Sequence, residues 1–259
     1  MRSTISRINA TALRIVMLVA FALSVIFTVW MLLAHNHMHH VLHIVHVTLI
    51  TLTFLLIALY LMKSAEIASL AAYRELRRRL AVDRSVALIE YLPEEAPIFN
   101  ACAGALAKSG IYVKSPAALK TLSALKTVAA DGNSPEREGY EITKQTLWRM
   151  GVELSDDTEG APISIVLGEL DPGCDIVITQ NKITQLLKAV YISRLYVACL
   201  KFTRLFLSGA ALAAAILLAF GMITYAAAAI TLWSATVVLT VKRIERRTTR
   251  MTFAQMYGN

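Results

Sequence analysis

Charged residues are scarce in this chain, and the residue types that carry most enzyme chemistry are few. Charged residues make up only 17% of the 259 residues, whereas hydrophobic residues make up 56%, which is too apolar for an ordinary soluble domain. The three cysteines, Cys102, Cys174 and Cys199, form no CxxC motif and lie far apart in the sequence. We therefore expect small buried thiols rather than a disulfide framework.

Histidine is absent after His46, and the middle of the chain has no glycine-rich phosphate loop and no Ser-His or Cys-His pair. These absences remove the common nucleophilic and nucleotide-binding arrangements, so we expect the protein not to be an enzyme. The acidic residues that we expect to be solvated charges in turns and at helix starts are Glu94, Glu95, Asp156, Asp157, Glu159 and Asp171.

Long apolar runs dominate both ends of the chain. Residues 15–34 contain no charge, and a second run covers 41–62. About 20 apolar residues are enough to cross the hydrocarbon core of a bilayer. These runs therefore predict one membrane span each, TM1 at about 12–34 and TM2 at about 41–62.

A third apolar stretch, 205–241, has no charged residue and no histidine. As one helix it would be about 55 Å long, which is too long for a single crossing. We expect a break near 221–225, which gives TM3 at about 205–220 and TM4 at about 224–241. One span followed by a re-entrant segment is the alternative.

The net charge of +8 is distributed unevenly along the chain. Residues 63–200 hold sixteen basic and seventeen acidic residues, whereas the flanks hold ten basic residues and one acidic residue. The short connections 35–40 and 221–225 contain no Lys or Arg, which is the asymmetry of the positive-inside rule. The basic residues that we assign to the membrane surface are Arg77, Arg78, Arg79, Lys242, Arg243, Arg246, Arg247 and Arg250. Both termini and the middle domain are thus predicted to be cytoplasmic, in a bacterial inner membrane, and nucleic acid is not expected as a partner.

The predicted fold is an α-helical polytopic membrane protein in which two hairpins flank a small cytoplasmic α+β domain. Prolines and changes of hydrophobic period divide that domain into helices at 94–109, 116–130 and 140–150 and strands at 111–113, 152–154, 163–167 and 176–178. The predicted organisation is a cytoplasmic N-terminus 1–11, hairpin 12–62, helical extension 63–92, domain 93–180, helix 181–204, hairpin 205–241 and basic tail 242–259.

All six histidines lie between His35 and His46, at the junction of TM1 and TM2. On a helix, His35, His39, His43 and His46 project within about 40° of one direction. Neutral imidazole is a good ligand for Zn, Cu and Ni, so this face is a candidate metal site. The alternative is a polar hairpin tip that happens to use histidine.

Small residues recur at helical spacing in the third apolar stretch. Such residues let helix backbones approach closely in lipid, where packing drives association. The residues that we assign to a helix-packing interface are Gly209, Ala211, Ala213, Ala215, Ala219 and Gly221. Packing against the chain's own first hairpin is the alternative.

Two functional hypotheses follow from these patterns. The first is a non-enzymatic subunit of an oligomeric inner-membrane assembly, such as a channel, a stator-like protein or a secretion-apparatus component. Its partners would be the lipid bilayer, further copies or other membrane subunits, and a cytoplasmic protein. The second is a transporter or sensor that uses the histidines between His35 and His46 for a transition metal or for protons.

Overall fold

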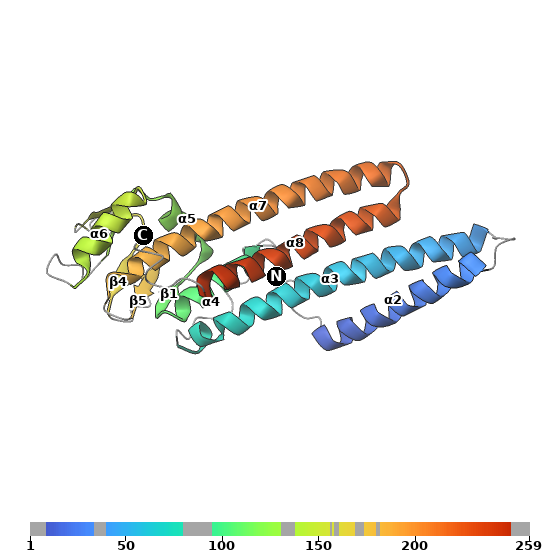
Figure 1. Ribbon diagram of the computed structural model, residues 1–259, viewed down its shortest axis with the longest axis horizontal. Helices are drawn as coiled ribbons and strands as arrows, with labels where there is room; N and C mark the ends of the chain where they lie inside the picture. The colour runs from blue at the N-terminus through green and yellow to red at the C-terminus, as the bar shows by residue number, and fades with distance from the viewer. Residues whose placement is uncertain are drawn as a thin grey trace. The chain divides into compact units, whose positions relative to one another are not determined.

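The computed structural model describes residues 9–33, 40–79, 95–130, 138–155, 157, 161–168, 174–179 and 182–249. The chain divides into two compact units. The first unit contains residues 1–67 and 202–240, and the second contains 68–201 and 241–259. Figure 1 labels the elements of both units.

Four long apolar helices confirm the predicted spans. They are α2 (Ala10–Leu33), α3 (His40–Arg79), α7 (Gln185–Ala219) and α8 (Ile223–Thr249). Each is long and apolar enough to cross a membrane. The chain is therefore a four-span membrane protein with an α+β domain between the second and third long helices. The 40 residues of α3 extend beyond the apolar run, as far as Arg79.

A tight turn separates α7 from α8. Gly221 has a positive φ of 73°, which an L side chain rarely adopts. Its N–H donates to the Leu218 carbonyl (2.9 Å), and the Met222 N–H donates to the Leu217 carbonyl (2.7 Å). These two bonds form a Schellman motif, which satisfies the last carbonyls of α7. The turn confirms the break that was predicted at 221–225.

In its described residues, the domain between the hairpins contains three helices and five short strands. Its elements are α4 (Glu95–Ala107), β1 (Ile111–Val113), α5 (Pro116–Ala124), β2 (Thr127–Ala129), α6 (Tyr140–Arg149), β3 (Glu153–Ser155), β4 (Ile165–Leu167) and β5 (Ile176–Ile178). One sheet has the order β1-β5-β4, with β1 antiparallel and β4 parallel to β5. In the second sheet β2 runs parallel to β3, and α6 forms the crossover between them.

The helix predicted at 116–130 is wrong over its last six residues. Ser115 caps α5 by accepting from the Ala118 N–H, as the Ser-Pro pair predicts, but α5 ends at Ala124. The next residues form β2, in which Val128 is fully buried and pairs with Leu154 of β3. Strand pairing across a distance of 26 residues thus overrides the local helix preference, because it buries a β-branched side chain.

The core of this unit is closed by the first half of α7. Leu186, Val190 and Tyr196 are fully buried with the strand residues Ile111 and Ile176. Residue 181, the predicted start of this helix, lies outside the described residues, and α7 begins at Gln185. Gly151, the residue after the helix predicted at 140–150, has a φ of 71° and closes α6 with a second Schellman motif.

Candidate functional site

The predicted histidine face is described only in part. His35 and His39 lie outside the described residues, and His43 is exposed on α3. His46 is half-buried, with its Nε2 2.9 Å from Thr28 Oγ1 of α2 and its ring centroid 5.8 Å from that of Phe27. His46 therefore lies at a contact between the first two spans and is not free in solvent.

The hydrogen bonds of Thr28 determine which nitrogen of His46 carries a proton. A hydroxyl has one proton, and that of Thr28 is donated to the Ser24 carbonyl (2.7 Å). Thr28 Oγ1 then accepts from His46 Nε2–H, and in the neutral imidazole with this tautomer Nδ1 is the nitrogen able to bind a metal. Within the described residues, no three His, Cys, Asp or Glu side chains are grouped so that they could hold a metal ion.

Hydroxyl groups join α3 to α2 and to α8 inside the first unit. Thr231 of α8 donates to the Phe54 carbonyl (2.8 Å). The Thr53 hydroxyl makes its shorter bond to the Leu49 carbonyl of its own helix (2.8 Å) and also lies 3.3 Å from the Ala20 carbonyl of α2. Thr51 and Thr224 lie 3.1 Å apart between α3 and α8. Thr-mediated bonds of this kind hold membrane helices together without a charge.

The small residues predicted to form an interface lie mainly on the outer side of α7. Those that are exposed are Gly209, Ala211, Ala215, Ala219 and Gly221, whereas Ala213 is half-buried. The side of α7 that faces its own unit carries Thr203 and Ala214, both buried. A Cβ built on Gly209 meets no atom within 4 Å. The stripe is therefore largely unused by the chain's own helices.

The predicted surface arginines and lysines follow two of the long helices. Four of them are exposed on the last turns of α8, where the helix dipole favours positive charge: Lys242, Arg243, Arg246 and Arg247. Arg250 lies outside the described residues. Arg77, Arg78 and Arg79 continue the backbone of α3, and their side chains are not among those described.

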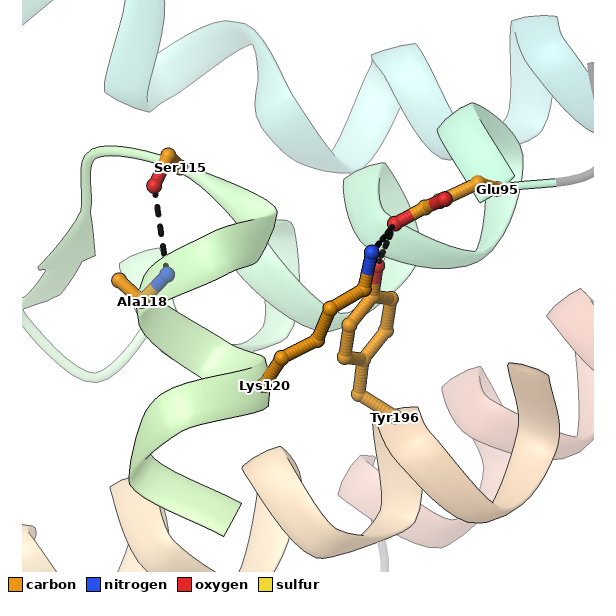
Figure 2. A network of polar contacts seen from close by, with 5 residues as sticks. All are labelled: Glu95, Ser115, Ala118, Lys120 and Tyr196. Atoms are coloured by element: carbon orange, nitrogen blue, oxygen red, sulfur yellow. Dashed lines mark hydrogen bonds and ion pairs between the residues drawn. The ribbon is translucent and has the colours of Figure 1, made fainter. Parts of the chain in front are cut away.

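A buried polar cluster in the second unit was not predicted from the sequence. Glu95, at the start of α4, is only 3% exposed, so the expectation of a solvated charge is wrong for this residue. Its Oε1 accepts a 2.7 Å hydrogen bond from the Tyr196 hydroxyl and lies 2.5 Å from Lys120 Nζ. Figure 2 shows the hydroxyl of Tyr196 and the ammonium of Lys120 converging on this oxygen from α7 and α5.

The cluster around Glu95 lets a carboxylate remain charged in a buried place, since it is both paired and hydrogen-bonded. Two further side chains attach the start of α7 to the domain. Arg194 Nη1 donates to the Met150 carbonyl (2.6 Å), and Lys188 Nζ donates to Ser109 Oγ. The first half of α7 is thus bonded to the start of α4, to Ser109 just after α4 and to Met150 at the end of α6. No sequence motif marks these contacts, because their partners lie up to 101 residues apart.

None of the three cysteines forms a disulfide in the structure, and the predicted burial is confirmed for two of them. Cys102 and Cys199 are buried, and Cys174 is half-buried. Burial raises the pKa of the Cys102 thiol well above its usual range, so this thiol is neutral at physiological pH. A neutral buried thiol is a poor nucleophile and a poor metal ligand.

Searches against protein-family models, curated proteins and solved structures gave no match for this chain.

Proposed function

We propose that this protein is a non-enzymatic subunit of an oligomeric assembly in a bacterial inner membrane, of the channel, stator-like or secretion-apparatus kind. In this proposal the α+β domain and both termini are cytoplasmic, and the domain docks a protein partner. The observation that carries the proposal is the outward position of the small-residue stripe on α7.

The stripe supports lateral association for a steric reason. Gly209, Ala215 and Ala219 present little side-chain volume, so a second helix could approach the α7 backbone closely. Within the chain only a small share of the α7 span is covered. Leu212 is 65% exposed on the same side, so its side chain would have to fit between the small residues of the second helix. The most fitting occupant is another copy of α7, because the same stripe is then present on both sides of the contact.

The attachment of α7 to the domain supports a role in transmitting movement. The helix is unbroken from Gln185 to Ala219, and its first half is held by the bonds of Tyr196, Arg194 and Lys188. A partner that displaces the domain would therefore displace the start of a membrane helix with it. An assembly component that responds to a bound partner needs such a connection.

The test is native mass spectrometry of the untagged protein released from its own membrane. Gly209→Leu adds side-chain volume at an open position of α7, since a Cβ built there meets no atom within 4 Å. We expect this variant to shift the complex to a smaller mass. The matched control is Leu205→Ile, an exposed position on the same helix that adds no volume. A Gly209→Leu complex of unchanged mass would contradict the proposed interface.

A second candidate function is a sensor or transporter of a transition metal or of protons. It is favoured by His46, whose Nε2 is held by Thr28 while Nδ1 stays open at the contact between α2 and α3. We expect Zn, Cu or Ni to be found in the same spectrum if this function is correct. Wild-type metal tolerance in cells that carry His39→Ala, His43→Ala and His46→Ala together would rule it out.

A further inference from the structure

Exposed large hydrophobic side chains are rare in the described part of the second unit. Only Ile142 and Trp148 are exposed there, at 53% and 75%, and both belong to α6. A tryptophan three-quarters exposed beside an exposed isoleucine, where the other large apolar residues described in this unit are covered, marks a contact surface.

The arrangement of residues on α6 is symmetric about its middle. The helix buries Tyr140, Thr143 and Leu147 and turns the opposite side outward. Gln145 lies at the centre of that outward side and is exposed. Ile142 and Trp148 lie three residues before and after Gln145, each rotated by about 60° from it.

The charges on this face have the same symmetry and opposite signs. Glu141 and Arg149 lie four residues before and after Gln145, and both are exposed. This order of charges follows the helix dipole, which favours an acid in the first turn and a base in the last. It also makes the face complementary to a reversed copy of itself.

We propose that α6 pairs with α6 of a second copy of this chain, antiparallel and about a two-fold axis at Gln145. The two-fold rotation brings Ile142 to the level of the second copy's Trp148, and Glu141 to the level of the second copy's Arg149. The two Gln145 amides meet on the axis, where each can donate and accept a hydrogen bond. Such a contact is isologous, as most dimer interfaces are.

The size of this contact fits a pairing that takes place only in the membrane-bound protein. A helix of 10 residues buries much less than the roughly 800 Å² per partner of a stable soluble complex. Four spans confine each copy to a bilayer. An oligomer held together by another interface would therefore raise the effective concentration of one α6 for another. The α6 pairing thus rests on the proposed function, because it needs the oligomer that the α7 interface would hold together, but it uses a different surface.

Cysteine cross-linking in native membranes tests the pairing directly. Gln145→Cys places a thiol on the two-fold axis, next to the same thiol of the second copy. We expect mild oxidation to convert this variant into a disulfide-linked dimer. Lys126→Cys, at an exposed position before β2, is the matched control and is expected to stay monomeric on the same gel, as is the unsubstituted protein with its three native thiols. Absence of the Gln145→Cys dimer, or equal dimer from the control, would overturn the pairing.

Charge reversal separates a self-contact from a contact with another protein. In the Gln145→Cys background, Glu141→Arg and Arg149→Glu each place like charges level with one another, so we expect each to reduce the dimer several-fold. The two changes together restore opposite charges, and the yield of dimer should recover. Both positions are exposed, so the fold should tolerate these variants. Failure of the double variant to recover would count against a two-fold contact.

Native mass spectrometry distinguishes failure of this inference from failure of the proposed function. A multimer that gives no Gln145→Cys dimer would overturn the α6 pairing alone. A protein that is monomeric in every spectrum and gives no cross-link would overturn both. If the Gln145→Cys dimer forms and Gly209→Leu leaves the mass of the complex unchanged, the α6 pairing is retained and the α7 interface is rejected.

Discussion

Single residues show how the second unit tolerates a charge in its interior. Glu95 is buried at the start of α4, yet it has the Tyr196 hydroxyl and the Lys120 ammonium at hydrogen-bond distance. A carboxylate in such a position is stable only while its partners remain, because an unpaired buried charge costs several kcal/mol. The sequence does not distinguish Glu95 from Glu94, because both are acidic residues at the start of a predicted helix.

Removing the Tyr196 hydroxyl should destabilise this unit. Tyr196→Phe deletes a hydrogen bond to a buried carboxylate, so we expect the free energy of unfolding to fall by about 1.5–3 kcal/mol. Tyr191→Phe is the matched control, because Tyr191 is half-buried on the same helix and its hydroxyl makes no hydrogen bond to a described residue. Denaturant unfolding followed by circular dichroism measures both. Equal losses in the two variants would show that the bond to Glu95 contributes nothing.

The thiols should differ in reactivity in the folded protein. Burial raises the pKa of Cys102, so its reactive thiolate is rarer at neutral pH than that of an exposed thiol. We expect Cys174, which is half-buried, to be modified by a maleimide well before Cys102. Mass spectrometry of the labelled peptides measures the order. Labelling of Cys102 at the rate of Cys174 would mean that α4 opens readily.

At the scale of elements, the helix ends were predictable and the strand pairing was not. Ser115-Pro116 and Gly151 mark the ends of α5 and α6, because each solves a local backbone problem within a few residues. Thr127–Ala129 became β2 only because β3 supplies a partner 26 residues later. No local pattern contains that information.

The turn between α7 and α8 should depend on glycine. Gly221→Ala forces a side chain into a positive-φ conformation, so we expect a loss of about 1–2 kcal/mol in stability in detergent. Gly209→Ala is the matched control, because Gly209 is helical and its added Cβ meets no atom within 4 Å. That change should be neutral or slightly stabilising. A Gly221→Ala variant as stable as the wild type would mean that the turn adopts another conformation.

At the scale of the whole molecule, the distribution of charge predicts the orientation of the chain. We expect Lys126→Cys in the domain to be protected from a membrane-impermeant thiol reagent in intact cells, and Met222→Cys in the α7–α8 turn to react. Met222 is exposed in that turn, so the reagent can reach it. Lysis should make Lys126→Cys reactive as an internal control. The opposite pattern in intact cells would invert the proposed topology.

The sequence by itself determined the four spans, the break near Gly221 and an α+β domain between the hairpins. These features depend on the length of apolar runs and on local backbone preferences, which are properties of short segments. Only the tertiary structure decided that Glu95 is buried, that residues 127–129 form a strand, that His46 contacts Thr28, and that the α7 stripe and the α6 face point outward. Burial and partner choice depend on residues far apart in the chain, and no short segment contains them.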